Sequence, residues 1–235
     1  MKKLYLLSCL ILSCITICVA QDISGFIIIK DDVEAGSHAL LQDYGMDEKL
    51  QLIGKYNQDI KSFPDSIQLY YDRANYYLLW KEYNAAIADY SKYIKKKPTD
   101  KKAFIKRSNV FLLQGNYKSA IADYTTITKL DPTDITNWLN RSNAYSKSKK
   151  YDLALSDIEA ALKIDPQNSA AWNVKCNIYI DAHKYDIAIL DFTNALKKNP
   201  GLTILYDCRG RIYEAQGNYK DAFTQYVSPD KNDKH

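Results

Sequence analysis

Five of the six prolines in the 235-residue chain stand at one fixed interval. Each is 34 residues from the next, and the set is Pro64, Pro98, Pro132, Pro166 and Pro200. Pro229 alone departs from this spacing. A strict period of this length is the sequence signature of a repeat architecture. Because stacked repeats present one long surface, we expect this chain to recognise a ligand along the array and not to catalyse a reaction in a pocket.

The repeats superpose without a gap when each unit starts three residues after a proline of this series. The five units begin at Ile67, Lys101, Ile135, Ser169 and Thr203. We number the positions within a unit as places 1 to 34, so that proline stands at place 32. Place 17 is tyrosine in every unit, namely Tyr83, Tyr117, Tyr151, Tyr185 and Tyr219. Place 20 is alanine in every unit, namely Ala86, Ala120, Ala154, Ala188 and Ala222.

Further places follow helical spacing. Places 4 and 11 are aromatic in all units, and place 8 is small: Ala74, Ser108, Ser142, Cys176 and Gly210. Places 4, 8 and 11 share one helical face, as do places 17, 20, 24 and 27. Small residues at places 8 and 20 allow two helices, A and B, to approach closely. Helix B must stop before each proline because the residue that precedes proline avoids the α region.

This pattern resembles the tetratricopeptide repeat (TPR), which runs W-x2-L-G-x2-Y, then A-x3-F, then P. The resemblance covers residues 67 to about 227 and implies an all-α fold, a right-handed superhelical solenoid of TPR helix pairs. We expect five units plus an N-terminal half-unit, preceded by a signal peptide (1–20) and an arm (21–46). The expected divisions are a capping helix at 47–66, repeats at 67–100, 101–134, 135–168, 169–202 and 203–229, and a polar tail at 230–235. Pro229 falls early, so the last helix B should be short and the array uncapped at that end.

The usual leucine at place 7 is replaced here by a base. Place 7 carries Arg73, Arg107, Arg141, Lys175 and Arg209, and place 23 carries Asp89, Asp123, Asp157, Asp191 and Gln225. Either the two series form base–acid bridges between helices A and B or to the next repeat, or they are two unrelated solvated faces. We favour the bridges, although an exposed pair would contribute only about 0.5 kcal/mol.

The N-terminus has the features of an export signal. Lys2 and Lys3 precede an apolar run that ends at Ala20, and this run is short for a membrane span of about 20 apolar residues. Cleavage after Ala20 is the favoured reading. Alternatively, Ile11-Leu12-Ser13-Cys14 resembles a bacterial lipobox, in which Cys14 would be lipidated. In both cases we expect an exported protein that is periplasmic, envelope-associated or secreted.

Charge and motif content argue against several function classes. Removing residues 1–20 leaves 30 basic and 28 acidic residues, which lacks the basic footprint typical of a nucleic-acid binder. There is no His-Glu-x-x-His, no Gly-x-Ser-x-Gly, no glycine-rich phosphate loop and no Cys-x-x-Cys. We therefore expect no enzyme activity, no cofactor and no metal site. A disulfide between Cys176 and Cys208 is disfavoured, because neighbouring helices usually lie about 8–10 Å apart.

The family resemblance places the concave face on helix A at places 2, 5, 9, 12 and 13. Place 9 reads Asn75, Asn109, Asn143 and Asn177, then Arg211. Each amide offers a donor and an acceptor, so this asparagine ladder could hold the backbone of an extended chain. Asparagine is also a structural residue at this place in the family, and the sequence leaves both roles open.

The rest of the expected groove is apolar at one end and polar at the other. The apolar candidates are Tyr71, Leu78, Leu79, Ile105 and Leu112. They either bind hydrophobic anchors of a ligand or lie under the Phe26–Ile29 segment of the arm. The carboxylate clamp of chaperone-binding TPRs is absent as a set, because Ala170 and Val174 stand where its third unit needs bases.

The sequence thus predicts an interaction module that grips an extended peptide or partner protein on its concave face. The alternative is a structural subunit of a cell-envelope assembly, docked through the uncapped C-terminal repeat or the N-terminal arm. Self-association through that repeat is a further expectation. A repeat fold does not by itself name a partner.

Overall fold

The structure is a computed structural model that describes residues 46–227. These residues form helices joined by short turns and contain no strand. The first helix is α3 (Met46–Ser62), and ten more follow in five pairs. The pairs are α4 (Ile67–Leu79) with α5 (Tyr83–Lys96), α6 (Lys101–Leu113) with α7 (Tyr117–Leu130), α8 (Ile135–Lys147) with α9 (Tyr151–Ile164), α10 (Ser169–Asp181) with α11 (Tyr185–Lys198), and α12 (Thr203–Gln216) with α13 (Tyr219–Val227). The expected all-α solenoid is confirmed.

Each expected unit contains one helix pair, and the helix limits follow the repeat register. Every helix A begins at place 1, and every helix B begins at the tyrosine of place 17. Side chains at place 34 cap several A helices: Asp100 accepts from the backbone N–H of Lys102, and Asp134 accepts from that of Thr136. Such caps satisfy backbone donors that the first helical turn leaves without partners. Helix B of the first four units ends at place 30, two residues before the proline.

The turn between helices A and B has the same backbone conformation in all units. Place 15 has a positive φ throughout, at Gly115 and Gly217 and also at Lys81, Lys149 and His183. The lysines have φ values of 58° and 59°. The turn therefore accommodates side chains in three of the five units, although a left-handed conformation is unfavourable for residues with a Cβ atom.

The core runs through the stack between the helices. Alanine at place 20 is buried in every unit, as the sequence predicted for a close approach of two helices. Place 24 of helix B also lies in the core, and its residues Tyr90, Tyr124, Ile158 and Phe192 are all fully buried. Its counterpart in the last unit, Tyr226, remains 44% exposed, and no described helix follows α13.

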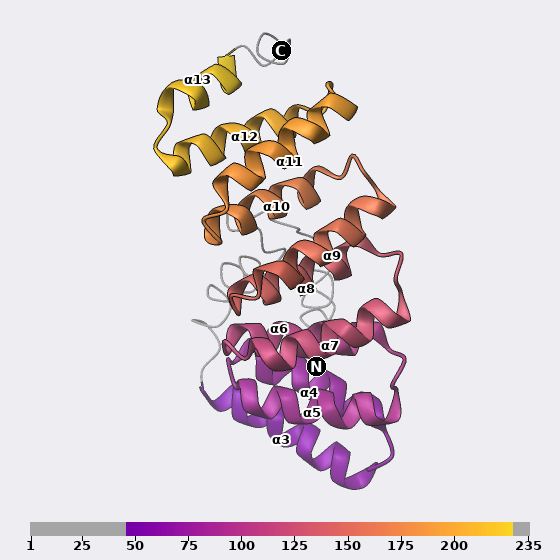
Figure 1. Ribbon diagram of the computed structural model, residues 1–235. Coiled ribbons are helices and arrows are strands. Elements are labelled where there is room, and N and C mark those ends of the chain that lie inside the picture. Colours follow the sequence, from indigo (N-terminus) through magenta and orange to yellow (C-terminus); the bar gives the residue numbers. More distant parts are fainter. Residues whose placement is uncertain (1–45, 228–235) are drawn as a thin grey trace.

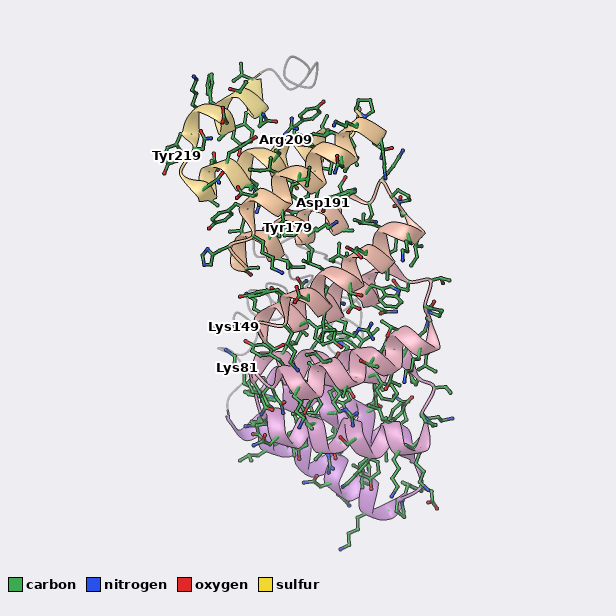
Figure 2. The ribbon with its side chains drawn as sticks, viewed as in Figure 1. Lys81, Lys149, Tyr179, Asp191, Arg209 and Tyr219 are labelled. Atoms are coloured by element: carbon green, nitrogen blue, oxygen red, sulfur yellow. The ribbon has the colours of Figure 1, made fainter. Side chains whose placement is uncertain are left out.

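The helices stack along one axis, from α3 at one end to α13 at the other (Figure 1). The exposed faces at the two ends differ. On α13, Tyr219, Phe223 and Val227 are all exposed and recur at helical spacing (Tyr219 is labelled in Figure 2). These three side chains form an apolar surface on the last described helix.

Unit 4 departs from the regular packing of the other units. Its two helices, α10 and α11, approach each other less closely than the paired helices elsewhere, while α10 lies directly against α12. Aromatic rings occupy the space between α10 and α11, with Phe192 at centroid distances of 6.1 Å from Trp172 and 5.9 Å from Tyr179. The expected signal peptide, the arm with its Phe26–Ile29 segment, Cys14 and the polar tail lie outside the described residues.

Candidate functional site

The ten residues proposed for the concave face all lie on A helices. Asn143 is buried, and the other nine are half-buried. The structure therefore places the set along the array in α4, α6, α8, α10 and α12, one helix per unit. None of the five apolar candidates is among the large hydrophobic side chains that are exposed.

The asparagine ladder is tied into the fold by its side-chain oxygens. The hydroxyl of Tyr90 donates to Oδ1 of Asn75 at 2.7 Å, and that of Tyr124 donates to Oδ1 of Asn109 at 2.9 Å. Both tyrosines stand at place 24 of the same unit. A hydroxyl that donates to Oδ1 fixes the orientation of the amide, because the Nδ2 group must then point the other way. In units 1 and 2 the amide oxygen is thus used internally.

Asn177 has a different partner, which comes from the next unit. Arg211 donates through Nη2 to Oδ1 of Asn177 at 2.5 Å and through Nη1 to Oδ1 of Asn173 at 2.6 Å. Arg211 stands at place 9 of unit 5, where the other units have asparagine. It joins α12 to α10 on the face that the sequence assigned to the groove. Residues at places 5 and 9 form one network at this end.

The apolar end of the proposed groove is partly used in packing. Tyr71 contacts the rings of Tyr90 and Tyr93 at centroid distances of 5.6 and 5.0 Å. Leu78 packs against the core of unit 1, while Ile105 and Leu112 pack against the core of unit 2. Burial is the main cause that raises the pKa of Tyr71, so its hydroxyl is uncharged at neutral pH. These side chains offer a half-buried apolar surface and not a deep pocket.

The predicted base–acid bridges are present, and they join the two helices of one unit. Arg141 donates through Nε to Oδ2 of Asp157 and through Nη2 to Oδ1 of the same residue, both at 2.7 Å. Arg73 with Asp89 and Arg107 with Asp123 repeat this two-pronged contact in units 1 and 2. The alternative of two unrelated solvated faces is wrong for these units.

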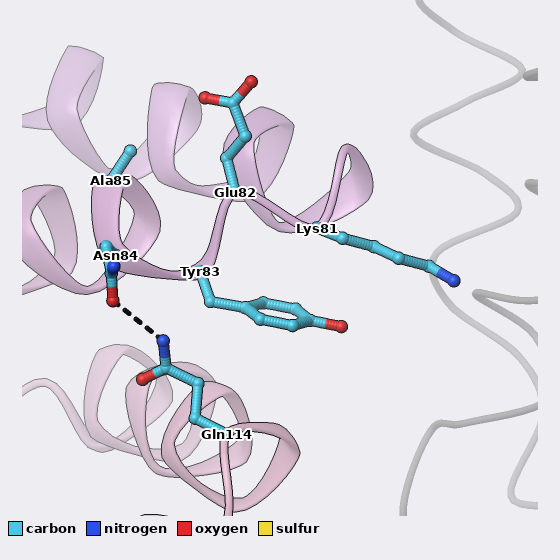
Figure 3. Close-up of a pocket in the computed structure, with 6 residues that line it drawn as sticks. All are labelled: Lys81, Glu82, Tyr83, Asn84, Ala85 and Gln114. Atoms are coloured by element: carbon cyan, nitrogen blue, oxygen red, sulfur yellow. Dashed lines mark hydrogen bonds between the residues drawn. The ribbon is translucent and has the colours of Figure 1, made fainter.

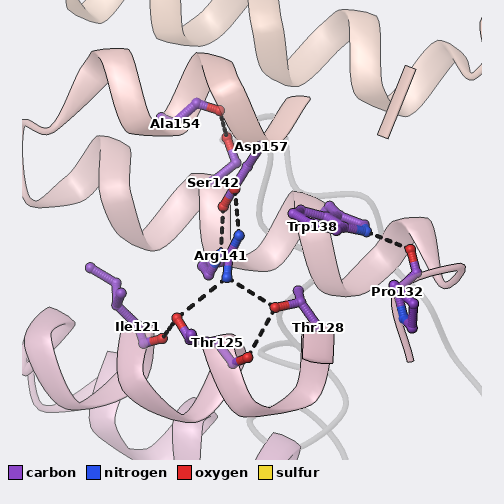
Figure 4. Close-up of polar contacts among 9 residues, drawn as sticks. All are labelled: Ile121, Thr125, Thr128, Pro132, Trp138, Arg141, Ser142, Ala154 and Asp157. Atoms are coloured by element: carbon purple, nitrogen blue, oxygen red, sulfur yellow. Dashed lines mark hydrogen bonds and ion pairs between the residues drawn. The ribbon is translucent and has the colours of Figure 1, made fainter. Parts of the chain in front are cut away.

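Each of these arginines also reaches the preceding unit, which the sequence did not predict. The Nη1 group of Arg141 donates to the Thr128 hydroxyl at 2.9 Å and to the Thr125 hydroxyl at 3.4 Å, both on α7 (Figure 4). Arg107 makes the equivalent contact with Ser91 at 2.8 Å. One side chain therefore connects three helices. The signal that could have revealed this is place 25, which carries Asn57, Ser91, Thr125 and Thr193 in register with the arginines.

The bases lie between aromatic rings of their own helix. The guanidinium of Arg141 stands 5.0 Å from the ring centre of Trp138 at place 4 and 5.9 Å from that of Tyr145 at place 11. A cation over an aromatic face is attracted by the ring quadrupole. Asp157 and Asp123 are mostly buried; burial raises the pKa of both carboxyls, whereas the facing arginines lower it. These bridges are thus structural elements of the interior.

A shallow pocket lies at the turn of unit 1, lined by residues from Lys81 to Ala85 and by Gln114 of unit 2 (Figure 3). The Nε2 group of Gln114 donates to Oδ1 of Asn84 at 2.8 Å across this pocket. Gln216 and Asp186 repeat the contact at 3.1 Å between units 5 and 4. The recurrence of this contact indicates that the pocket belongs to the stacking of neighbouring turns.

The described residues give no sign of a metal or redox centre. No group of three or more His, Cys, Asp or Glu side chains in residues 46–227 could hold a metal ion. Cys176 and Cys208 are buried free thiols whose sulfur atoms contact backbone carbonyl groups across the α10–α12 seam at 3.6 Å. No helix among the described residues is long and apolar enough to cross a membrane.

Comparisons with known proteins agree with this architecture. Family models for the tetratricopeptide repeat match residues 71–135, 136–168 and 176–228, which together make up more than half of the chain. No curated protein matches it.

Several solved structures have the same fold. A TPR protein from Parabacteroides merdae has a TM-score of 0.58 at 15% identity, covering 83% of this chain and 76% of that one. YrrB, described as a TPR protein with an unusual peptide-binding site, has a TM-score of 0.51 at 18% identity, with 75% and 93% covered. MamA from Desulfovibrio magneticus has a TM-score of 0.53 at 18% identity, with 69% and 92% covered. At these identities the likeness establishes the fold alone.

Proposed function

Because the chain belongs to the tetratricopeptide repeat family, we propose that it is an exported protein–protein interaction module that holds an extended segment of a partner on its concave face. The observation that carries this proposal is the pair of oriented amides in units 1 and 2. Tyr90 and Tyr124 take the Oδ1 atoms of Asn75 and Asn109, which leaves each Nδ2 group as a donor. Within residues 46–227, no partner occupies the Nδ2 group of Asn75 or Asn109.

The chemistry of these donors defines the ligand class. An amide N–H donor recognises a backbone carbonyl group whatever the side chain beside it, and each such bond contributes about 1 kcal/mol net. Tyr71, Ile105 and Leu112 lie half-buried on the same helices and provide apolar contact area for ligand side chains. An extended peptide with hydrophobic residues at one end fits both features. In this view Asn143, Asn177 and Arg211 continue the contact toward unit 5, and Leu78 and Leu79 extend the apolar end.

The decisive experiment must separate loss of a donor from loss of stability. Replacing Asn75 alone with alanine would leave the buried Tyr90 hydroxyl without a partner, which destabilises the fold. The test variant is therefore Asn75→Ala with Tyr90→Phe, combined with Asn109→Ala and Tyr124→Phe. Its matched control carries only Tyr90→Phe and Tyr124→Phe. Partner proteins are captured from the native cell envelope, identified by mass spectrometry and titrated against each variant.

We expect the test variant to lose binding and the control to retain most of it, because only the former lacks the amide donors. Equal binding by the two variants, with equal helicity by circular dichroism, would contradict a groove built on the asparagine ladder.

A second candidate function has its own supporting observation. The α13 face exposes Tyr219 (73%), Phe223 (66%) and Val227 (60%), which is the surface that a following repeat would cover. This end would suit a structural subunit of an envelope assembly or a self-associating protein. Phe223→Ser should then abolish assembly while groove binding persists. The reverse result, with assembly unchanged and capture lost only in the ladder variant, would favour the interaction module.

Export and anchoring form a separate part of the proposal. Cleavage after Ala20 gives a soluble exported chain, whereas processing at the Ile11–Cys14 motif gives a lipoprotein. Labelling cells with a fatty-acid analogue distinguishes the two, with Cys14→Ser as the control. Label that disappears in Cys14→Ser shows a lipid anchor, and an unlabelled mature chain beginning at Gln21 shows simple cleavage.

A further inference from the structure

Units 1 to 3 show how a complete base–acid bridge occupies its carboxylate. In unit 2, Arg107 fills both oxygens of Asp123, with Nε on Oδ2 at 2.9 Å and Nη2 on Oδ1 at 2.7 Å. The Asp side chains of these three units are only 3 to 7% exposed. Because the units share one register, they act as internal references for unit 4.

Unit 4 leaves one carboxylate oxygen open. Lys175 replaces the arginine and contacts Oδ2 of Asp191 at 2.5 Å. The Tyr179 hydroxyl donates to the same Oδ2 at 3.0 Å, and the two residues lie close together in Figure 2. In the described part of the chain, Oδ1 of Asp191 has no hydrogen-bond partner, and the Asp191 side chain is 32% exposed.

A cavity lies beside this carboxylate. It has a volume of about 210 Å³ and is lined by Leu162, Pro166, Trp172, Asp191, Asn194 and Lys198, among others. It lies at the junction of units 3 and 4, between Leu162 and Pro166 on one side and residues of α10 and α11 on the other. The Trp172 indole forms part of its wall and is held in place by a 3.0 Å hydrogen bond from Nε1 to the Pro166 carbonyl oxygen. Carboxylate, amide and aromatic groups therefore meet in one opening.

The local charge also differs from that of the other units. Place 25 of the preceding unit is neutral where an arginine contacts it, at Ser91, Thr125 and Thr193. Before unit 4 the same place is Glu159. Burial, then the charge of Asp191, and also that of Glu159, raise the pKa of Tyr179, so both carboxylates act on this hydroxyl. The cavity also has an ammonium group in its wall, the exposed Lys198, so the room for a further donor is at Oδ1 of Asp191 and not at Oδ2, which Lys175 and Tyr179 contact.

We propose that unit 4 carries a binding site for a guanidinium group, supplied by an arginine side chain of a partner protein. The guanidinium donates to Oδ1 of Asp191, the oxygen that Nη2 of the arginine reaches in units 1 to 3. A planar fork suits a carboxylate in a way that a second ammonium group does not. The site is built from places 4, 23 and 26, not from place 9, so it is separate from the asparagine ladder.

The test uses the mature chain, uniformly labelled with ¹⁵N, and N-acetyl-arginine amide as the probe. N-acetyl-citrulline amide is the matched uncharged analogue, and N-acetyl-lysine amide is the matched ammonium. The readout is the indole N–H signal of Trp172, assigned with Trp172→Phe. We expect a saturable shift with the arginine probe and an affinity at least about tenfold weaker for either analogue, because a charge-assisted hydrogen bond is lost or misdirected.

Two single substitutions in unit 4, and a copy of the site built into unit 3, test whether the probe binds at Asp191. Lys175→Arg restores the fork of the other units, fills Oδ1 from inside and should abolish the shift, as should Asp191→Asn. Transfer of the site to unit 3 with Arg141→Lys and Thr125→Glu should make the Trp138 indole respond to the same probe. Circular dichroism checks that each variant is folded.

Three outcomes would overturn the proposal. The first is the absence of a saturable Trp172 shift with the arginine probe. The second is unchanged binding in Lys175→Arg. The third is binding of the arginine probe to Lys198→Ala but not to the natural chain. That result would mean that the exposed Lys198 ammonium at the cavity already pairs with Asp191.

Discussion

At the scale of single residues, the arginine at place 7 explains why the TPR pattern is altered in this chain. Leucine at that place would only pack, whereas Arg107 joins helix A to Asp123 of its own unit and to Ser91 of the preceding one. The carboxylate is nearly buried, with 6% of its side chain exposed. Removing one partner of a buried pair is costly because the other charge is left without compensation.

We therefore predict that Arg107→Met destabilises the protein by about 3 kcal/mol, measured by urea unfolding at pH 7. The more exposed pair Lys101–Asp131, with side chains 41% and 26% exposed, provides the control, and Lys101→Met should leave the urea midpoint almost unchanged. Burial raises the pKa of Asp123, and without Arg107 nothing opposes that rise. A carboxyl group whose pKa is raised in the folded state destabilises the fold as the pH rises through that pKa. The free energy of unfolding that Arg107→Met loses should therefore become smaller as the pH is lowered toward 4. If Arg107→Met lost no more stability than Lys101→Met, the Arg107–Asp123 pair would contribute no more than a surface salt bridge.

Asn137 is a second residue whose effect on stability can be predicted. It stands at place 3 with 2% of its surface exposed, and its Nδ2 atom has no hydrogen-bond partner among the described residues. Place 3 is leucine or alanine in the other units, including the fully buried Leu205.

Asn137→Leu should raise the free energy of unfolding by about 1 kcal/mol, because it removes a buried donor without a partner at nearly constant volume. Asn109→Leu is the matched control and should destabilise, since the Tyr124 hydroxyl then loses its acceptor. Thermal and urea unfolding of both variants give the comparison. Destabilisation by Asn137→Leu would mean that the amide has a structural role after all.

At the scale of elements, the helix limits could be predicted from the sequence, and the contacts between helices largely could not. The proline at place 32 and the tyrosine at place 17 mark helix ends because they act on the local backbone. Tyr90 and Asn75 lie 15 residues apart, and their hydrogen bond depends on how α5 docks on α4. The open carboxylate oxygen in unit 4 could not be predicted from the sequence either. Lysine in place of arginine at position 175 keeps the positive charge, and only the structure shows that Oδ1 of Asp191 then lacks a hydrogen bond in the described residues.

The turn between helices A and B provides a test at this scale. Lys149 has a φ of 59°, a left-handed conformation that costs roughly 1–2 kcal/mol for a residue with a Cβ atom. Glycine removes that cost but makes the unfolded chain more flexible, so Lys149→Gly should stabilise by a net amount below about 1 kcal/mol. Gly115→Ala imposes the strain at the same place of unit 2, where φ is 70°, and should destabilise. Shifts of the urea midpoint in opposite directions for the two variants would agree with this account, and shifts in the same direction would contradict it.

At the scale of the whole molecule, stability depends on contacts between neighbouring units. The arginines tie units 1, 2, 3 and 5 to the helix before them, and the next helix A packs against helix B of units 1 to 4. Among residues 46–227 only α13 lacks that cover, and its unit also replaces the aspartate with Gln225, which accepts from Arg209 at 2.7 Å. The array is thus held by polar and aromatic groups that recur from α3 to α13. Buried tyrosine hydroxyls are part of this system in units 1, 2 and 4.

These tyrosines predict alkaline unfolding. Burial raises the pKa of Tyr90 and of Tyr179 and raises that of Tyr124 to about 12, against 10.0 for the free side chain. A folded pKa above the unfolded value contributes stability that is complete below pH 10.0 and is lost as pH rises through the folded pKa. Each such group removes about 1.4 kcal/mol of unfolding free energy per pH unit in that window. Tyrosinate absorbance at 295 nm should therefore show an early phase from exposed tyrosines and a later cooperative phase that coincides with loss of helical circular dichroism. The combined Tyr90→Phe and Tyr124→Phe variant, with two of these groups removed, should lose stability less steeply above pH 10 than the natural chain, and an unchanged slope would contradict the assignment.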